Sequence, residues 1–396
     1  MILLLPFLGF SQGEWDNWYF GVNAAMKFIN GTPVALPPSP MGISVSQMSS
    51  SVSDSAGNLL FYSNGYRVWS YNHNWMSNGN GLLGGVNATR QPVFAVPVVG
   101  NKNQYYLFTV GRFESTGPLT GLHYSIIDMT LNGGFGAIVP GFKNIPLPTG
   151  DSAVNHLTAI RHQNNKDVWV VVFRHGYIRQ YLAYLITESG ISNPVVSNSS
   201  LSPVFYQKGS LRISQDGQNL VCSDSIAEMC YFNPATGAIT RRFTFLPRYM
   251  GLLAPADGME FSVDSRYLYT IKTDGNLTTN TPLWQFDMEQ SDSANFMQSG
   301  VLIGTMSAGS IQMGPDGRIY LGNPKFPIDS LNRINDPSSP GTNFNYELNA
   351  VYLGGTNCNG SLPQFLQRYK AYIHSSGQCQ GHPVIFSGDI WPPADT

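Results

Sequence analysis

Hydrophobic and polar positions along this chain repeat with a spacing of about fifty residues. In each repeat, a polar turn rich in Asp, Asn and Gly leads directly into a run of aromatic and β-branched residues, as in 215–221 and 315–321. The turns are marked by Asp16, Asp54, Asn101, Asn164, Asp216, Asp264 and Asp316. A spacing of this length built from strands is typical of radial repetition. The sequence therefore predicts an all-β protein, a seven-bladed β-propeller, with six or eight blades as the alternatives.

The turns within a repeat carry the residues that reverse a chain between antiparallel strands. Asp-Gly and Asn-Gly accept a positive φ in a tight turn, and residues 213–239 hold enough turns and apolar runs for the strands of one blade. We expect the propeller to span residues 13–372. Strands from 350–353 and 362–366 are expected to complete the first blade and so remove its open edge. The general architecture expected is that of WD-repeat or YVTN-type propellers, without the WD-repeat signature itself.

Composition agrees with a strand-rich fold and excludes some partners. Hydrophobic residues make up 42% and aromatic residues 12% of the chain, whereas charged residues make up only 12%. The formal net charge is −2 and the basic residues are scattered, so no basic face is available to neutralise phosphates. No segment is long and apolar enough to cross a bilayer. We therefore predict neither nucleic-acid binding nor membrane insertion.

The two ends of the chain differ from the repeating region. Residues 1–12 form an apolar run too short to span a bilayer, and Gly9 and Ser11 suit a cleavage site just after Ser11. We interpret residues 1–12 as a signal peptide remnant, although the positive n-region is missing; a buried first strand is the alternative. After Tyr372 the pattern changes. Residues 373–396 are expected to be a linker and the start of a further, truncated module.

Several stretches carry a family resemblance: 17–21, 31–36, 57–65, 76–84, 124–134, 157–162 and 362–367. In this order they are similar to the N-terminal β-propeller region of Bacteroidetes cell-surface proteins that the type IX secretion system exports and that end in a type B sorting domain. The resemblance covers roughly residues 15 to 370. It implies a secreted protein attached to the outer cell surface, with a monomeric propeller domain inside a larger multidomain chain. After Cys379 it implies a PKD-like or Ig-like module.

Three histidines fall within one repeat: His156, His162 and His175. His162 ends the strand before a marker turn and His175 ends the strand after it, so both are placed at one rim and are candidate binding residues. A metal ion needs three or four convergent ligands, and the neighbouring Arg161 and Arg174 oppose a cation. The sequence therefore predicts no metal site. The alternative for these histidines is a structural role, such as a hydrogen bond to a turn carbonyl.

A second candidate binding surface is the aromatic row Trp69, Tyr71, His73 and Trp75. Alternate residues of a strand lie on one face, so these four side chains are expected side by side. Such a row suits stacking on a sugar or docking of a protein partner. The alternative is that the row packs between neighbouring blades.

Cys222 and Cys230 flank a predicted hairpin whose turn is centred near Ile226. That register places the two residues opposite each other on adjacent strands, within reach of a disulfide. Export would put them in an oxidising compartment where such bridges form. Two buried free thiols are the alternative.

No set of residues with catalytic spacing emerges from the sequence. The segments 42–46 and 209–211 lack the second glycine of a nucleophile elbow, and most Asp residues lie in turns. We predict no catalytic residue and no cofactor. The expected function is a secreted cell-surface binding or adhesion module, without catalysis, whose rim loops contact a protein or a glycan. The alternatives are an exported carbohydrate-active enzyme, a hydrolase or lyase with carboxylates in the central funnel, and a structural spacer.

Overall fold

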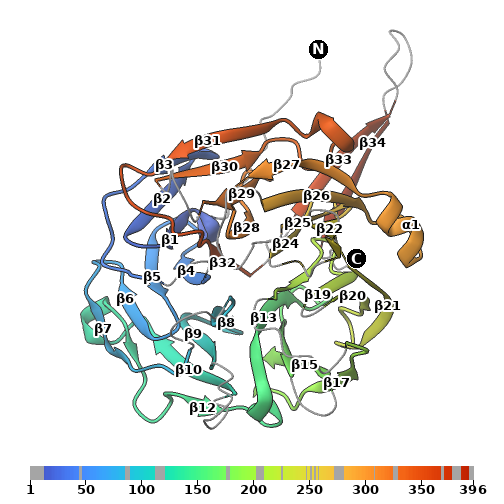
Figure 1. Cartoon of the computed structure of the whole chain (residues 1–396). Helices are drawn as coiled ribbons and strands as arrows, with labels where there is room; N and C mark the ends of the chain where they lie inside the picture. The colour runs from blue at the N-terminus through green and yellow to red at the C-terminus, as the bar shows by residue number, and fades with distance from the viewer. Residues whose placement is uncertain are drawn as a thin grey trace.

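The computed structural model describes residues 13–43, 47–84, 90–111, 121–174, 179–201, 209–223, 226–246, 248–249, 252–253, 256, 258–271, 281–306, 308–323, 329–366, 370–376 and 385–391. Nearly all regular structure in these residues is strand, and the sheets are arranged around an axis in a propeller-like ring (Figure 1). The all-β, propeller-like prediction is confirmed at this level. The predicted signal remnant, residues 1–12, lies outside the described residues.

Five separate antiparallel sheets form most of the ring in the described part of the chain. The first sheet contains β1 (Asn17–Phe20), β2 (Ala24–Ile29) and β3 (Thr32–Ala35). The second contains β13 (Ala153–Arg161), β14 (Val168–Arg174), β15 (Gln180–Thr187), β16 (Gly190–Ile191) and β17 (Val195–Asn198). The third contains β18 (Leu211–Ile213), β19 (Asn219–Ser223), β20 (Ala227–Phe232) and β21 (Ile239–Phe245). The fourth contains β24 (Gly258–Phe261), β25 (Tyr267–Ile271), β26 (Thr281–Asp287) and β27 (Val301–Met306). The fifth contains β28 (Ser310–Met313), β29 (Ile319–Gly322), β30 (Ser330–Ile334) and β31 (Tyr346–Tyr352).

The rest of the ring is one ten-stranded sheet. It contains β4 (Ser49–Ser53), β5 (Leu59–Ser63), β6 (Arg67–Ser70), β7 (Trp75–Asn80), β8 (Val93–Val98), β9 (Asn101–Val110), β10 (Leu122–Asp128), β11 (Ala137–Ile138), β12 (Ile145–Pro146) and β32 (Pro363–Gln364). Ser77 of β7 pairs in parallel with Ala137 of β11, which joins two runs of strands. The prediction of seven separate blades is therefore wrong: five blades stand apart, and the second and third repeats share one sheet.

The marker turns form as the sequence predicts. Gly57, Gly217 and Gly317 all have positive φ, near 78°, 71° and 77°. Ser214 N–H donates to Asn219 O at 2.8 Å, closing one such turn and leading the chain into β19. Asp54 Oδ1 accepts the N–H groups of Ala56 and Asn58 in another. These short-range contacts close the turns, and the residue that takes the positive φ is a glycine at three markers and Ser265 at the turn of Asp264.

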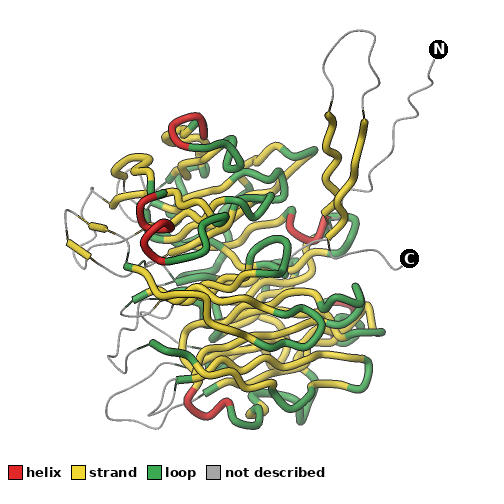
Figure 2. The backbone as a smooth tube through the Cα atoms, turned by 90° about the vertical axis from the view of Figure 1, so that its right-hand side faces the viewer, coloured by secondary structure: helices red, strands yellow, loops and turns green. Residues whose placement is uncertain are grey.

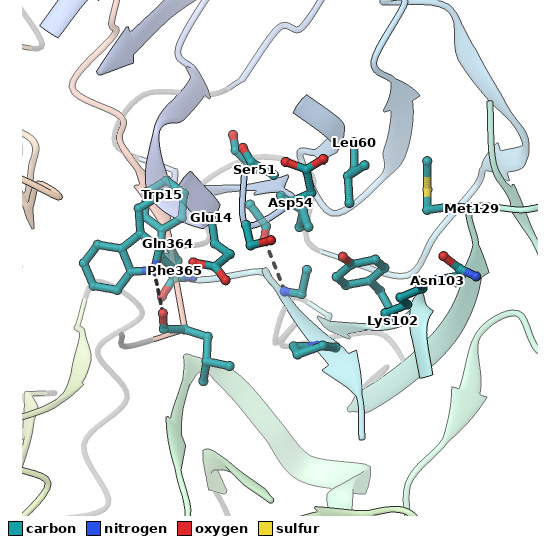
Figure 3. A pocket seen from close by; sticks show the side chains of 18 of the residues that line it. Glu14, Trp15, Ser51, Asp54, Leu60, Lys102, Asn103, Met129, Gln364 and Phe365 are labelled. Carbon is teal, nitrogen blue, oxygen red and sulfur yellow. Dashed lines mark hydrogen bonds between the residues drawn. The ribbon is translucent and has the colours of Figure 1, made fainter. Parts of the chain in front are cut away.

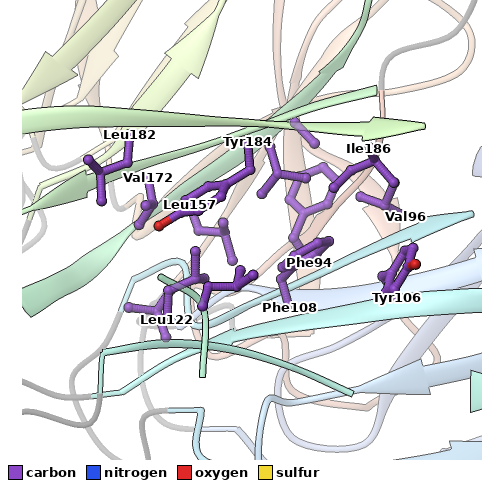
Figure 4. Close-up of a cluster of buried hydrophobic side chains, with 14 of the residues drawn as sticks. Phe94, Val96, Tyr106, Phe108, Leu122, Leu157, Val172, Leu182, Tyr184 and Ile186 are labelled. Atoms are coloured by element: carbon purple, nitrogen blue, oxygen red, sulfur yellow. The ribbon is translucent and has the colours of Figure 1, made fainter. Parts of the chain in front are cut away.

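Apolar side chains fill the spaces between neighbouring sheets. In one such cluster, Phe94 and Phe108 of the ten-stranded sheet meet Leu157, Val170 and Tyr184 of the next sheet, and all five are buried (Figure 4). Burying a side chain of this size stabilises the fold by about 1.5–3 kcal/mol. Packing between sheets therefore holds the ring together even where no backbone hydrogen bond crosses it.

Residues from near the two ends of the propeller region meet at the ring's closure. The segment 350–353 overlaps β31 and its neighbouring loop, and β31 pairs with β30 rather than with the first sheet. The segment 362–366 supplies β32, whose Pro363 pairs in parallel with Ser49 of β4. The closing strand pair is thus made on the second repeat, and the backbone next to the first sheet pairs with the end of the ring through a bridge between Val22 and Asn357. This corrects the expectation that both segments complete the first blade.

Few other elements are present in the described residues. The helical segments are η1 (Gly13–Trp15), η2 (Asn132–Gly134), η3 (Gly150–Ser152), η4 (Gly341–Phe344) and α1 (Ser293–Gln298). Two small hairpins pair β22 (Arg248–Tyr249) with β23 (Leu252–Leu253), and β33 (Lys370–Ser376) with β34 (Ile385–Trp391). The β33–β34 hairpin extends away from the ring (Figure 2) and begins two residues before the expected boundary at 372. None of the helices described is long and apolar enough to span a membrane.

Candidate functional site

A cavity of about 510 Å³ opens where η1, β4 and β5 face β8 and β9. Trp15, Glu14 and Phe365 lie at one end of it, and Lys102, Asn103 and Met129 lie toward the other (Figure 3). The remaining lining residues are Ser50, Ser51, Val52, Ser53, Asp54, Ser55, Leu60, Ala95, Pro97, Tyr105, Arg161, Gln364 and Leu366. This volume lies in the range of small-molecule sites, and the cavity is the strongest candidate for a ligand site.

One wall of the cavity is held in place by contacts between distant parts of the chain. Trp15 stacks on Phe365 with ring centroids 5.5 Å apart and an interplanar angle of 25°. Its Nε1–H donates to Leu366 O at 2.6 Å. Gly13 packs so closely against Gly57 that an added Cβ would lie 2.2 Å from Gly57 N. The aromatic wall is therefore held by contacts within the chain itself.

The serines of β4 form the polar floor of the cavity. Ser50 Oγ accepts Ala95 N–H at 3.2 Å, and Ser53 Oγ accepts Asn17 Nδ2–H at 3.0 Å. A serine hydroxyl that accepts one hydrogen bond still has a proton to donate. The floor is thus a row of small, positioned hydroxyl groups, in contrast to the aromatic wall.

Two carboxylates reach the same cavity but differ in their surroundings. Asp54 uses Oδ1 for Ala56 N–H and Asn58 N–H, and its Oδ2 accepts Asn58 Nδ2–H at 2.9 Å. Its carboxylate is thereby committed to the marker turn. Glu14 sits on η1 and lines the cavity beside Trp15, Gln364 and Phe365 (Figure 3). Glu14 is therefore the carboxylate better placed to contact a ligand.

Tyr105 lies between these acidic groups and the apolar lining. Burial raises the pKa of its hydroxyl to about 12, and the negative charges of Asp54 and Glu14 add to the effect. The ring is edge-on to Phe61, with centroids 5.3 Å apart. Tyr105 is consequently a neutral hydroxyl donor at physiological pH, on a ring fixed by packing.

Buried polar side chains from several sheets meet around Arg212. Arg212 is buried, with Nη2 3.1 Å from Gln312 Oε1 and Nε 3.7 Å from Glu260 Oε2. Gln364 Oε1 accepts from Arg212 Nη1 at 3.3 Å and from Gln91 Nε2 at 2.8 Å. The void beside this group measures about 10 Å³, which is at the lower limit for one water molecule. The carboxylate of Glu260 is thus buried and paired with a guanidinium in this part of the described structure.

The aromatic row does not lie on one strand. Trp69 lies in β6, and Tyr71 and His73 lie in the turn that follows. Trp75 is the first residue of β7 and pairs with Trp69 across the hairpin. This corrects the expectation of a single strand face, because the polar residues of the turn reverse the chain and His73 has a φ of 66°. Trp69 is buried and stacks on Tyr62 at 5.5 Å, whereas Trp75 is 58% exposed. The row is thus split into a packed part and a solvent-facing part.

The histidines lie apart in the described structure. His162 Nδ1 accepts Asn164 N–H at 3.0 Å, so the Nε2 that lies 3.0 Å from Ala235 O is the protonated nitrogen. His156 is fully buried, with Nε2 2.8 Å from Ser223 O, and burial lowers its pKa to about 4. His175 lies outside the described residues. Where the chain is described, no three His, Cys, Asp or Glu side chains gather in a way that would hold a metal ion.

The predicted disulfide is absent. Cys222 pairs with Glu228 and Cys230 with Leu220 in the strand register, and both side chains are buried thiols outside any disulfide. The hairpin turn is centred one residue earlier than expected, since Ser223 pairs with Ala227. That shift moves the partner of Cys222 by two positions, from Cys230 to Glu228, and explains why the two sulfurs do not face each other.

The residues that line the cavity were not identified as site residues from sequence. Trp15 and Leu366 are far apart along the chain and meet only through ring closure. Glu14 and Trp15 do precede the first repeat, but a Glu-Trp pair alone has no specific meaning. Tyr105 and Lys102 belong to a marker repeat, where their composition indicates only a strand.

Comparisons with known proteins do not identify a family. No protein-family model matches the chain, and no curated protein matches it. A Bacteroides uniformis structure described as a candidate 6-phosphogluconolactonase is 10% identical, with a TM-score of 0.48, covering 89% of this chain and 98% of the other. A β-propeller domain from Myceliophteria thermophila is 14% identical, with a TM-score of 0.39, covering 78% and 94%. An exo-β-1,3-galactanase from Phanerochaete chrysosporium is 10% identical, with a TM-score of 0.34, covering 76% and 70%.

Proposed function

We propose that this chain is a secreted, surface-attached binding module whose cavity binds a carbohydrate. The observation that carries the proposal is the presence, in one cavity of about 510 Å³, of the stacked Trp15 and Phe365 rings, the serines of β4 and the carboxylate of Glu14. A sugar presents an apolar face and a rim of hydroxyl groups. Aromatic rings suit that face, and positioned hydroxyl and carboxylate groups suit that rim.

The location is part of the proposal. The apolar residues 1–12 have the character of a signal peptide remnant. The sequence stretches that resemble exported Bacteroidetes surface proteins, and that follow one another in the same order, support the same location. A binding module carried outside the cell meets glycans on surfaces and in the medium, which is consistent with a cavity suited to a sugar.

We further propose that the ring has seven radial units, two of which are fused. Strands β4–β7 and β8–β10 each form an antiparallel run of their own. The two runs are joined by one parallel pair, Ser77 with Ala137. The cavity lies between these runs, so the fused pair of units forms the binding part of the ring.

A carbohydrate-active enzyme is the second candidate, because Glu14 and Asp54 both line the cavity and both raise the pKa of Tyr105. Glycoside hydrolysis requires one carboxyl group as an acid and a second as a nucleophile or base. Asp54 has both oxygens engaged in its turn, which favours binding over catalysis. Release of reducing sugar that Glu14→Gln abolishes would establish the enzyme instead.

Binding is tested with the whole chain on a glycan array, followed by calorimetry on the ligands found. Glu14→Gln keeps the size of the side chain and removes its charge, so it should weaken binding about fivefold to tenfold while the melting temperature stays unchanged. Glu289→Gln, at an exposed carboxylate outside the cavity lining, is the matched control and should bind these ligands as the parent chain does. The proposal is wrong if no glycan binds, as a spacer would behave, or if Glu14→Gln binds every ligand as tightly as the parent chain.

A further inference from the structure

The outer hairpin of β6 and β7 carries an exposed indole with a cation fixed on one of its faces. Trp75 is 58% exposed, and the guanidinium carbon of Arg67 lies 4.1 Å from its ring centroid. Arg67 is held there because its Nε donates to Asn80 Oδ1 at 2.9 Å. An aromatic ring fixed on one side loses little conformational entropy when a ligand stacks on the other. Trp75 therefore has the properties of a binding platform.

A second cation converges on the same place. Lys143 Nζ donates to Asn80 O at 2.5 Å and lies 3.3 Å from Asn78 Oδ1. The two cations meet here because β7 bulges: Arg67 pairs with Asn80 and Trp69 with Trp75, which leaves extra residues on β7, and Asn78 takes a φ of 58°. The bulge places Arg67, Lys143 and Trp75 around one asparagine, so the arrangement is specific to this hairpin.

The surroundings hold little negative charge. The sequence has no Asp or Glu from position 55 to 113, or from 129 to 150. These two stretches supply β5, β6, β7, β11 and β12. Asp128, the carboxylate between them in the described residues, accepts Thr130 N–H, Thr130 Oγ1–H and Gln104 Nε2–H. In a chain with a net charge of −2, this hairpin is a local cationic surface.

A neighbouring pair of exposed rings extends the surface along the hairpin. Tyr71, in the turn between β6 and β7, stacks on Phe135 with centroids 5.4 Å apart and an interplanar angle of 16°. Ser70 Oγ donates to Phe135 O at 2.6 Å, which ties the turn to the loop before β11. The surface thus has more than one aromatic contact point, as a chain of sugar rings would require.

We propose that the Trp75 platform, defined as Trp75, Arg67, Asn80 and Lys143, binds a polyuronate, a polysaccharide whose sugar rings carry carboxylates. The apolar face of a pyranose ring stacks on the open face of Trp75, and the carboxylates of the polymer meet Arg67 and Lys143. Both the ring and the charge are used, because charge-assisted hydrogen bonds supply direction and stacking supplies contact area. The platform is separate from the cavity, whose lining contains none of its residues.

The test measures binding of the whole chain to sodium polygalacturonate by calorimetry at two salt concentrations. Trp75→Ala should weaken binding about tenfold, and Lys143→Gln should weaken it severalfold and reduce its salt dependence. Both side chains lie at the surface, so neither change should move the melting temperature. Tyr352→Ala, which removes a 63% exposed ring from β31, is the matched control and should bind as the parent chain does.

Two further ligands separate the parts of the proposal. Fully methyl-esterified polygalacturonate has the sugar rings without the charge, and poly-L-glutamate has the charge without the rings; both should bind at least tenfold more weakly than polygalacturonate. The proposal is overturned if either binds equally well, if polygalacturonate does not bind, or if Trp75→Ala binds it unchanged. Glu14→Gln should leave this binding intact, so failure of the cavity proposal and failure of this one are distinguishable.

Discussion

The indole Nε1–H of Trp15 donates to the carbonyl oxygen of Leu366 at 2.6 Å, which joins two residues from opposite ends of the ring. The same indole stacks on Phe365, and the backbone carbonyl of Trp15 accepts Trp18 Nε1–H at 2.9 Å. A single side chain thereby fastens η1 to the segment that follows β32. Ring closure in this protein depends on a side-chain contact as well as on the short parallel pairing of β32 with β4.

Trp15→Phe tests this contact, because it keeps an aromatic ring and removes the donor. We expect the free energy of unfolding to fall by about 1–3 kcal/mol, since the Leu366 carbonyl loses a partner in a partly buried place. Denaturant unfolding gives the measurement. Trp75→Phe, at an exposed indole, is the control and should change the value by less than about 0.5 kcal/mol. Equal effects at the two positions would contradict the role of Trp15 in closure.

Arg212 is the second point that holds the sheets together. Its guanidinium contacts Gln312, Gln364 and the carbonyl of Met259, and Glu260 is close by. Burial lowers its pKa, while the charge of Glu260 acts in the opposite direction. We expect Arg212→Met to lower the free energy of unfolding by about 3–5 kcal/mol, because it removes a cation that lies beside a buried carboxylate.

A double change separates charge from packing at this place. Arg212→Met with Glu260→Gln should be less destabilising than the sum of the two single changes, because the second change removes the carboxylate charge that the first deprives of Arg212. Arg266→Met serves as the control: Arg266 lies 3.7 Å from Glu289 with both side chains mostly exposed, and such pairs contribute about 0–1 kcal/mol. Additive effects at Arg212 and Glu260 would show that the two residues are not coupled.

The predictable part of the fold is the part that local sequence controls. Asp-Gly pairs predict turns with positive φ, and Gly217 and Gly317 have it. The repeat of turns and strands about every fifty residues predicts a ring of sheets, and the structure has such a ring (Figure 1). The fusion of two repeats was not predictable, because it needs one pairing between β7 and β11. A pairing of this kind depends on how a bulge and a loop are placed in space.

The two errors in local geometry have a common cause. A hairpin register is set by the position of its turn, and a shift of one residue in the turn centre moved Cys222 from Cys230 to Glu228. The prediction that the aromatic row lies on one strand was wrong for a similar reason. Asn72 Oδ1 accepts Asn74 N–H, and the chain turns between Trp69 and Trp75. In that case the signal was present, as polar residues alternate with the rings.

The cavity has no local signature in the sequence. Its residues come from η1, from β4, β5, β8 and β9, and from the end of the ring. What brings them together is closure, in which residues separated by most of the chain become neighbours. Residue types alone did not distinguish Glu14 from the other acids, because its distinction is that it lines the cavity beside Trp15 and Phe365 (Figure 3).

His156 makes the stability of the fold depend on pH. The imidazole is fully buried beside Phe173, and burial lowers its pKa to about 4, with the charge of Arg179 acting in the same direction. In the unfolded chain the pKa returns to about 6.5. Between these values the unfolded state binds more protons than the folded state, so the free energy of unfolding rises with pH across this window. The contribution is fully present above pH 6.5 and is lost as the pH falls toward 4.

His156→Gln removes this titration while keeping a side-chain donor near Ser223 O. The pKa of His156 is about 6.5 in the unfolded chain and about 4 in the folded chain, and each pKa unit corresponds to about 1.4 kcal/mol. On acidification the parent chain should therefore lose about 3 kcal/mol of its free energy of unfolding, and the variant should retain this amount. Denaturant unfolding at pH 7, 6, 5 and 4 measures both slopes. His162→Gln, at a partly exposed ring in a turn, is the control and should keep the slope of the parent chain. Parallel slopes for the parent chain and His156→Gln would mean that His156 is not held neutral in the folded protein, since only a buried neutral imidazole gives this window.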